Sequence, residues 1–354
     1  MARSRRFLIL AEGDFGPMSS KTANAFIRYA PQEVVGVLDS ASSARTVNEV
    51  LGFGGDIPVV ASFTDGLALG PNALLIGIAP AGGQFPASWR AMVCDALRAG
   101  LDVWNGLHSM LGDDSEFASL ARASGATIRD LRRPPTDLAV GWGRVRDLEA
   151  TIVLTVGTDC NIGKMTTQLQ VLDATRRLGH RVHFGATGQT GILVEGRGIA
   201  VDAVIADFIA GAAERLTIEA AQDADIVLVE GQGSLLHPAY SGVTLGLMHG
   251  ALPHAMVMCA QPSRLTIDRN PWVRIPPLRE MIALHETVME SLRPSPVIAV
   301  ALNTFDLSDH DAREAVARVA GETGLPTTDP VRFAPEPIAA AIASFHVDRT
   351  AVAL

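Results

Sequence analysis

The chain has 354 residues, a length that suggests two domains. Hydrophobic residues make up 48% of it and charged residues 19%, so it can bury sizeable cores and is not globally disordered. Its formal net charge of −9 argues against a nucleic-acid partner, because nucleic-acid-binding domains usually carry a basic surface.

Short apolar runs alternate with helical patterns in the first half of the chain. The expected strands are "RFLILA", "EVVGVLDS", "DIPVVAS", "NALLIGIAP", "LDVWNGL" and "GATIRDLR". The expected helices are "SSKTANAFIRYA", with serine at its N-cap position, and "PASWRAMVCDALRAG", which ends at a glycine. Strands that alternate with helices predict a parallel, doubly wound sheet.

A domain boundary is expected in "RRPPTDLAVGWGRVRDLEA", where two prolines break any helix and the composition turns polar. We place one domain over residues 1–135 and a second over 136–354. The second series has strands at "ATIVLTVG", "RVHFGAT", "DIVLVEG", "HAMVMCA" and "PVIAVALN". Its helices are expected directly after the first of these strands, over Ala203–Gln222, within Pro277–Leu292 and near Asp309–Thr323. The pattern again predicts a parallel α/β domain.

The number and spacing of the cysteines indicate in which cellular compartment the protein is expected. Cys94, Cys160 and Cys259 are odd in number and widely spaced, which argues against a disulfide framework and favours a reducing cytoplasm. The apolar run Phe7–Ala11 is too short for a signal peptide and ends in acidic residues. No stretch approaches the roughly 20 apolar residues that span a bilayer. We therefore expect a cytoplasmic protein without membrane contact.

A phosphate-binding loop is predicted at "VLTVGTDCNIGKMTTQLQ", where a strand leads into a glycine loop, a lysine and a helix. Gly157, Gly163 and Lys164 are interpreted as the glycines and lysine of the G-x-x-x-x-G-K-[ST] frame. Backbone N–H groups of such a loop, with the helix N-terminus, bind anions. The residues expected to contact a phosphorylated ligand are Gly157, Thr158, Asp159, Cys160, Asn161, Gly163, Lys164, Met165 and Thr166.

Met165 stands where the frame requires the hydroxyl that holds Mg²⁺. A thioether is a poor ligand for this hard cation, so we expect no metal and a ligand held without chemistry at its phosphates, such as coenzyme A. Cys160 lies beside a helix N-terminus, where a thiol has a lowered pKa and could be reactive. A small packing residue is the simpler interpretation of this cysteine. Asp159 would repel phosphates unless its side chain points elsewhere.

Polar residues follow the buried run "IVLV", at the sheet edge where open α/β folds bind ligands. Glu230 is a candidate general base or Mg²⁺ ligand, with a capping carboxylate as the alternative. His237 is the second candidate base, with a solvated loop residue as the alternative. Gln232, Ser234 and Tyr240 are hydrogen-bonding groups on the same loop, and we expect them to bind substrate.

The stretch "GATGQTGILVEGRGIAVDAVIADFIAG" supplies further candidates. Gln189 and Thr190 follow a strand, again at a carboxyl edge, and are expected to bind substrate. Asp202 and Asp207 lie five residues apart on the expected helix and therefore project from different faces. We expect one of them, Asp207, to be a catalytic candidate and the other to be a cap.

Arginines are concentrated in the proline-rich stretch "CAQPSRLTIDRNPWVRIPP". Arg264 and Arg269 are candidates for binding substrate carboxylates, because a guanidinium can hold a carboxylate or phosphate through two hydrogen bonds. Surface solubility is the alternative for each of them.

Long motifs of the chain resemble the DUF1611 family. "GTDCNIGKMTT", "GATGQTGI", "VDAVIADFIAGAAE" and "VEGQGSLLHPAYSGVTLGLMHG" are similar to its P-loop half. "LAEGDFGPMSSKTANAFIRY" and "IAPAGGQFPASWRAMVCDALRAGLDVWNGLHSMLGDD" are similar to its Rossmann-like N-terminal half. The resemblance implies an α/β fold with a Rossmann-like domain followed by a P-loop NTPase-like domain with a parallel sheet. It also implies an acetyl-CoA-dependent N-acetyltransferase for D-glutamate or D-glutamine, with an epimerase-type partner enzyme.

Other functions stay open at this point. "GTDCNIGK" and "VEGQG" also resemble dethiobiotin synthetase, which would imply an ATP- and Mg²⁺-dependent carboxylase or ligase with Glu230 on the metal. A non-catalytic, nucleotide-binding P-loop protein is a further alternative. For the acetyltransferase we expect Glu230 or His237 to deprotonate the substrate amine and the Gly231–Ser234 backbone to stabilise the oxyanion. Many α/β enzymes assemble symmetrically, so a homo-oligomer is expected.

Overall fold

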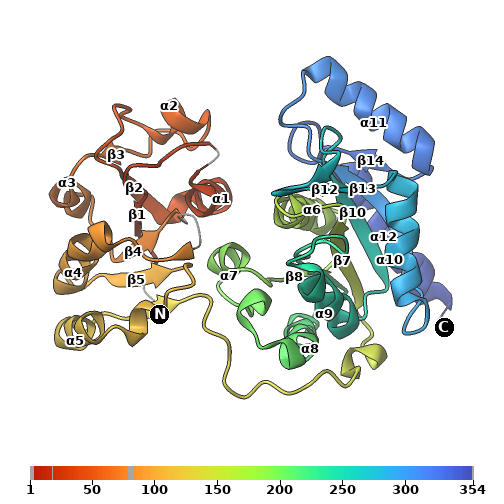
Figure 1. Cartoon of the computed structure of the whole chain (residues 1–354), viewed down its shortest axis with the longest axis horizontal. Coiled ribbons are helices and arrows are strands. Elements are labelled where there is room, and N and C mark those ends of the chain that lie inside the picture. The colour runs from red at the N-terminus through yellow and green to blue at the C-terminus, as the bar shows by residue number, and fades with distance from the viewer. Residues whose placement is uncertain (1–3, 18, 79–82, 353–354) are drawn as a thin grey trace. The chain divides into compact units, whose positions relative to one another are not determined.

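The computed structural model describes residues 4–17, 19–78 and 83–352. The chain divides into two compact units, which Figure 1 shows in colours from red to blue along the sequence. The first contains the described residues up to Arg133 together with Ile192–Gly196, and the second contains the rest. Residues 79–82, within one of the quoted family motifs and the end of an expected strand, lie outside the described part.

The first unit contains a parallel six-stranded sheet with the strand order β3-β2-β1-β4-β5-β6. This is the order of a Rossmann-like fold, so the predicted fold class is confirmed for this half. The strands are β1 (Phe7–Leu10), β2 (Val34–Leu38), β3 (Val59–Val60), β4 (Ala73–Ile76), β5 (Asp102–Asn105) and β6 (Ile128–Asp130). The α-helices are α1 (Lys21–Tyr29), α2 (Val47–Leu51), α3 (Phe63–Ala68), α4 (Arg90–Arg98) and α5 (Ser115–Ser124).

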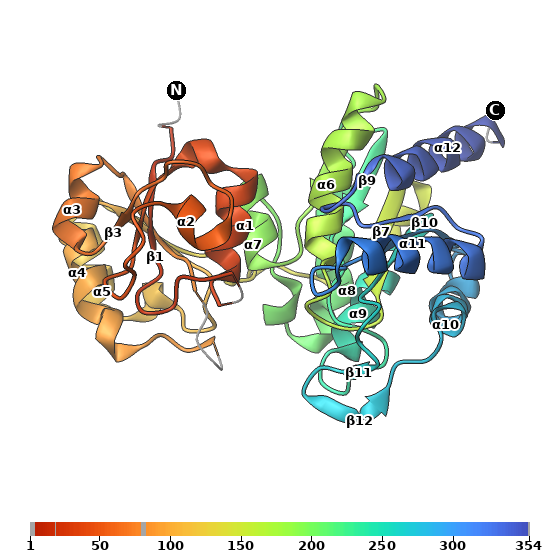
Figure 2. The same ribbon diagram turned by 90° about the horizontal axis from the view of Figure 1, so that it is seen from above.

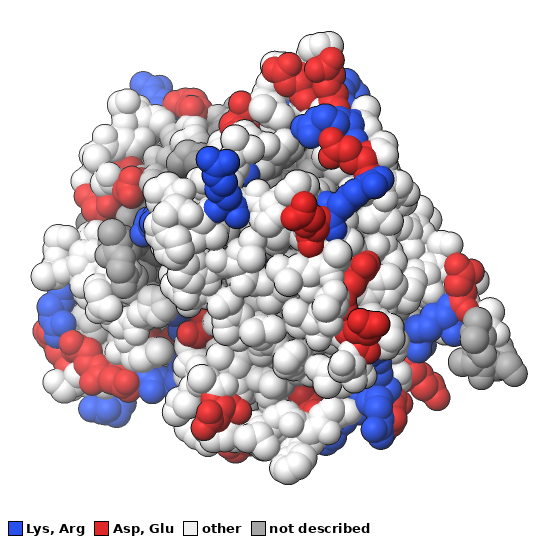
Figure 3. All heavy atoms as spheres, turned by 45° about the vertical axis from the view of Figure 1, so that its right-hand side comes forward, with Lys and Arg blue, Asp and Glu red and all other residues white. Residues whose placement is uncertain are grey.

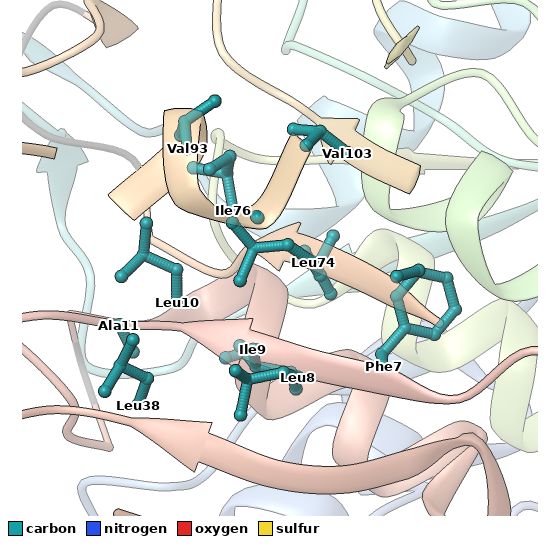
Figure 4. Packing of buried hydrophobic residues seen from close by; sticks show 14 of the residues in the cluster. Phe7, Leu8, Ile9, Leu10, Ala11, Leu38, Leu74, Ile76, Val93 and Val103 are labelled. Atoms are coloured by element: carbon teal, nitrogen blue, oxygen red, sulfur yellow. The ribbon is translucent and has the colours of Figure 1, made fainter. Parts of the chain in front are cut away.

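The central strand β1 is fully buried, which explains why its sequence is a continuous apolar run rather than an alternating one. Figure 4 shows its side chains between those of the neighbouring strands and α4. Phe7 packs edge-to-face on Phe26 and Trp104, with ring centroids 5.0 and 5.4 Å apart. Ser20 occupies the N-cap position of α1 as expected, but its hydroxyl bonds Gly16 and Asn24 instead of capping the helix.

The second unit contains a parallel six-stranded sheet with the order β14-β13-β10-β7-β9-β8, which confirms the α/β prediction for this half. These strands are β7 (Thr151–Gly157), β8 (Val182–Gly185), β9 (Ile226–Val229), β10 (Ala255–Ala260), β13 (Val297–Leu302) and β14 (Thr327–Thr328). A separate antiparallel hairpin is formed by β11 (Thr266–Ile267) and β12 (Asn270–Arg274). The α-helices of this unit are α6 (Lys164–Arg177), α8 (Ile209–Ala220), α9 (Ser241–Ala251), α10 (Leu278–Glu290), α11 (Asp309–Thr323) and α12 (Glu336–Val352). Helix α7 (Gln189–Glu195) begins in this unit, and its residues from Ile192 on belong to the first unit. Figure 2 shows α6 and α12 side by side, and the two helices contact each other.

One expected helix has different bounds in the structure. The helix predicted over Ala203–Gln222 begins only at Ile209, because two short 3-10 turns, Val201–Ala203 and Ala206–Phe208, precede it. Asp202 and Asp207 therefore lie in separate turns, and the prediction that both lie on one helix is wrong.

Helix α9 was not expected, because its sequence contains several glycines, which are poor helix formers. Tertiary packing explains them. A Cβ on Gly250 would lie 2.1 Å from the carbonyl oxygen of Ala210 in α8, and one on Gly246 would lie 2.3 Å from Cγ2 of Ile209. The close approach of the two helices therefore requires glycine at both positions.

The segment before β7 is held by a buried carboxylate. Glu214 of α8 accepts hydrogen bonds from the backbone N–H groups of Trp142 (3.0 Å) and Arg144 (2.8 Å), and from Nε of Arg144 (2.6 Å). Burial alone would raise the pKa of Glu214, but the guanidinium and the backbone donors outweigh it and hold the pKa below its usual value. This network fixes the start of the second unit against α8.

Charged side chains of both signs are interspersed on the face shown in Figure 3. Ion pairs such as Arg181–Asp225 (2.6 Å) and Arg177–Glu336 (3.0 Å) bring opposite charges together in the second unit. Within the described part of the chain, α12 has 17 residues and no helix combines the length and apolarity that a membrane span needs.

Candidate functional site

The predicted phosphate-binding loop connects the central strand β7 to helix α6, at the carboxyl edge of the second sheet (Figure 1). Gly163 precedes α6 with φ +101°, a conformation that residues with a Cβ rarely adopt. Thr158 to Ile162 separate the two glycines, one residue more than the frame has, so Gly157 does not fall on the first glycine of that frame. The fold context of strand, loop, lysine and helix is nevertheless that of a P-loop.

Lys164 is buried and lies across its own loop. Its Nζ donates a hydrogen bond to the carbonyl oxygen of Asp159 (2.7 Å), and burial lowers its pKa. The hydroxyl of Thr167 is buried beside Sγ of Cys259 (3.7 Å), while Met165 and Thr166 are half-buried. The residue directly after the lysine therefore offers a thioether and not an oxygen ligand.

The carboxylate of Asp159 is buried, and both of its oxygens accept hydrogen bonds from protein groups. Oδ1 accepts the N–H of Cys160 (2.7 Å), and Oδ2 accepts Nη1 of Arg264 (3.0 Å) and the N–H of Asp268 (2.8 Å). Arg264 also donates to the carbonyl oxygen of Cys160 (3.0 Å). The negative charge of Asp159 is thus neutralised, and Arg264 is already engaged.

The expected lowering of the Cys160 pKa is wrong. Burial raises the pKa of this half-buried thiol, and the nearby Lys164 does not overcome that effect. Cys160, Asp159 and His237 offer ligand atoms within 4.8 Å of one another, a spacing that suits a metal ion. However, both oxygens of Asp159 already accept hydrogen bonds, and so does Nδ1 of His237, from the N–H of Ala239 (3.1 Å). These donor atoms fit a hydrogen-bonded network better than a metal site.

Glu230 follows β9, which pairs with the P-loop strand β7. Its Oε2 accepts the N–H groups of Thr187 (2.9 Å) and Gly188 (3.0 Å), which follow β8. Burial raises its pKa to about 7, against the opposing effect of these two N–H donors and of Lys164. A Cβ on Gly191 would lie 2.5 Å from Oε2, so the carboxylate fills the space that this glycine leaves. A carboxylate with this pKa can accept a proton near neutral pH.

The loop after Glu230 is fixed by hydrogen bonds. The N–H of Gly231 donates to Oγ1 of Thr155 (2.9 Å), so this N–H is engaged and cannot serve the oxyanion role expected for it. A Cβ on Gly231 would lie 1.7 Å from the carbonyl oxygen of Thr155, so only glycine fits. Gln232 donates to Thr187, and the buried Ser234 donates to the carbonyl oxygen of Thr158 in the P-loop (3.0 Å).

His237 is buried, so the alternative of a solvated loop residue is wrong. Because its Nδ1 accepts the N–H of Ala239, the neutral ring carries its proton on Nε2. The ring of Tyr240 lies against it at 4.5 Å between centroids and is half exposed to solvent. The loop that carries His237 contacts the P-loop in two ways. Ser234 donates a hydrogen bond to it, and His237 lies close to Asp159 and Cys160.

The remaining residues that were predicted to belong to the site are half-buried or exposed. Gln189 and Thr190 begin α7 and are half-buried. Asp207 is exposed, and among the described residues no hydrogen bond or ion pair joins it to the P-loop. Arg269 is exposed at the turn of the β11–β12 hairpin. Asn161 is exposed on the P-loop with φ +55°.

Sequence reasoning missed Thr187 and Asp268, which contact the site through their backbone N–H groups. Backbone donors leave no side-chain signature. The one available signal was the glycine-rich run after β8, where Gly188 and Gly191 make room for a carboxylate.

The fold and the site define a P-loop α/β protein with a Rossmann-like first unit. A DUF1611 P-loop domain matches residues 139–339, and the family's Rossmann-like N-terminal domain matches residues 40–134. The chain belongs to the DUF1611 family, as its motifs indicated. The crystal structure of a DUF1611 family protein from Anabaena variabilis superposes with a TM-score of 0.91 at 40% identity, covering 96% of this chain and 99% of that one.

Two further relatives carry the name D-glutamate N-acetyltransferase. The protein from Tritonibacter scottomollicae is 39% identical over 267 residues, which are 75% of this chain and 79% of that protein. The protein from a Pseudoalteromonas species is 36% identical over 272 residues, which are 77% of this chain and 81% of that protein.

Proposed function

We propose that this protein is an N-acetyltransferase that moves the acetyl group of acetyl-CoA to the amine of D-glutamate or a similar acidic D-amino acid. The observation that carries the proposal is the similarity, over three quarters of the chain, to two proteins named D-glutamate N-acetyltransferase. The P-loop of Gly157–Thr166 would bind phosphates of coenzyme A through backbone N–H groups and Lys164. Met165 supports this role, because the loop then grips phosphates without needing a metal ligand after the lysine.

Glu230 is the general base of this proposal. The amine of the acceptor arrives as an ammonium group and must lose a proton before it attacks the thioester. A carboxylate with a pKa of about 7 accepts that proton far better than an ordinary glutamate does. The nitrogen then bonds to the acetyl carbon, the carbon–sulfur bond breaks, and the second proton of the amine passes to the departing coenzyme A thiolate.

His237 is the hydrogen-bond donor of this proposal and not a base. Its Nδ1 is occupied by the N–H of Ala239, so the neutral ring presents Nε2–H as a donor. A donor of this kind suits the oxyanion of the tetrahedral intermediate or the departing thiolate. Gln232, Ser234 and Tyr240 lie on the same loop and would position the acceptor. An epimerase-type pathway partner and a symmetric homo-oligomer belong to the same proposal.

The test is an assay with acetyl-CoA and D-glutamate, D-glutamine or L-glutamate, in which released thiol and N-acetylated product are both measured. We expect thiol release in step with the acetylated D-amino acid, with and without EDTA. ATP turnover without thiol release would overturn the proposal in favour of a ligase. Tight nucleotide binding without turnover of either donor would favour a non-catalytic P-loop protein.

A further inference from the structure

Arg269 adopts a backbone conformation that suits glycine. It occupies the two-residue turn between β11 and β12, where Ile267 pairs with Asn270, and its φ is +58°. Tight hairpin turns require positive φ and therefore favour glycine or asparagine, whereas a long side chain meets steric strain there. Strained residues are concentrated at functional sites, where the side chain is retained for what it binds.

The turn is attached to the P-loop. The N–H of Asp268, directly before Arg269, donates to Oδ2 of the buried Asp159 (2.8 Å). Arg264, which lies two residues before β11, donates to the same carboxylate and to the carbonyl oxygen of Cys160. The hairpin turn therefore keeps a fixed position next to the phosphate-binding loop.

The two arginines on this segment have different partners. Arg264 is committed to Asp159 and Cys160. Arg269 is exposed, and its guanidinium makes no hydrogen bond or ion pair with any residue that the structure describes. A cation that is held beside a ligand loop without a protein partner is available to an anion of the ligand.

We infer that Arg269 is the anion receptor of the site and that Arg264 is a positioning residue for the hairpin that carries it. Resting on the proposed function, this assigns Arg269 to an anionic group of the ligand, either a carboxylate of the acidic acceptor or a phosphate of acetyl-CoA. A guanidinium can hold either group through two parallel hydrogen bonds.

The test is the variant Arg269→Gly, because glycine removes the guanidinium and the backbone strain together. We expect the KM for one substrate to rise about 10- to 100-fold, as for the loss of one charge-assisted hydrogen-bonded pair. A rise for D-glutamate alone identifies the acceptor carboxylate, and a rise for acetyl-CoA alone identifies a phosphate. The melting temperature should stay equal to that of the wild type or rise, whereas damage to the fold would lower it. Arg269→Lys, which keeps the charge, should restore part of the binding.

Asp223→Gly is the matched control. Asp223 is also an exposed residue with φ +58°, and among the described residues it has no hydrogen bond to the P-loop or the hairpin. This variant should change the melting temperature as Arg269→Gly does and leave both KM values unchanged. Values of KM within twofold of the wild type in Arg269→Gly would overturn the inference.

A failure of the proposed function is recognised separately. If the wild type does not transfer acetyl groups, calorimetric binding of D-glutamate and of coenzyme A is compared between the wild type and Arg269→Gly. Weaker binding of either ligand in the variant supports the inference that Arg269 binds an anion, and only the proposed acetyltransferase function is then rejected. Equal binding of both ligands rejects the receptor.

Discussion

The guanidinium of Arg264 lies 3.0 Å from the carboxylate of Asp159, a residue with no solvent exposure, and this pair joins the P-loop to the β11–β12 hairpin. Removal of one partner from a buried ion pair leaves the other charge uncompensated, at a cost of about 3–5 kcal/mol. Arg264→Met should therefore destabilise the protein strongly. Asp159→Asn should cost less, because Arg264 is partly solvated. Urea unfolding measures both.

The double variant Asp159→Asn with Arg264→Met is the control for this pair. It should be more stable than Arg264→Met alone, since no unpaired charge remains. Strict additivity of the two single effects would contradict the coupling.

Glu230 should determine the pH dependence of activity. The base must be ionised, and its pKa is raised to about 7 by burial, so kcat/KM for the acceptor should increase about tenfold per pH unit well below that value and level off above it. Glu230→Gln should abolish this limb and reduce the rate by about 10²–10⁴-fold. A pH profile of the variant with the same limb as the wild type would reject Glu230 as the base.

The same carboxylate should also affect stability. Folding raises the pKa of Glu230 from 4.5 to about 7, so the folded protein holds a proton that the unfolded chain releases between these values. The contribution of protonated Glu230 to the free energy of unfolding is fully present below the pKa of the unfolded chain. It is lost as the pH rises through the pKa of the folded protein. Glu230→Gln, which does not ionise, should gain on the order of 3 kcal/mol relative to the wild type between pH 4 and pH 8. Urea unfolding across that range measures the difference, and a constant difference would contradict the shift.

Gly191 should be essential for the placement of Glu230. Its Cβ would lie 2.5 Å from Oε2, so Gly191→Ala should displace the carboxylate and lower activity. Gly321 in α11 is the matched control, because a Cβ there meets no atom within 4 Å. Gly321→Ala should raise stability by about 0.5–1 kcal/mol and leave activity unchanged. Steady-state kinetics and thermal melting separate the two effects, and an equally active Gly191→Ala would refute the argument.

Met165 should determine whether the P-loop uses Mg²⁺. We expect the affinity of the wild type for ATP to be the same with Mg²⁺ and with EDTA. Met165→Ser restores the hydroxyl of the common frame and should make ATP binding at least about tenfold tighter with Mg²⁺, a difference of about 1.4 kcal/mol. Calorimetry with and without Mg²⁺ measures this. Strong Mg²⁺ dependence in the wild type would show that another residue supplies the metal ligand.

Periodicity and composition predicted both sheets, because buried parallel strands such as β1, β7 and β10 are continuous apolar runs. The same information could not predict α9, whose glycines are explained only by contact with α8. The hairpin was also missed, since β11 has two residues and its partner β12 contains Pro271. Part of its attachment to the P-loop is the backbone N–H of Asp268, which no residue pattern records.

For the candidate site, the sequence could predict at which edge of the sheet a residue lies, but not which side chains bind each other. Glu230 and Lys164 could be placed at one sheet edge, because each follows a buried strand. The sequence could not show that Asp159 binds Arg264, or that burial outweighs the helix N-terminus at Cys160. Both outcomes depend on which groups share a low-dielectric environment, and that is a property of the folded chain.

The three thiols bear on how the enzyme can be assayed. Burial raises the pKa of Cys94 and of Cys160, and raises that of Cys259 to about 11. The thiolate is the form of a cysteine that attacks a disulfide reagent, so at neutral pH all three protein cysteines should react slowly. A colorimetric disulfide reagent added during turnover should therefore report coenzyme A almost alone, with little background and without inactivating the protein it monitors.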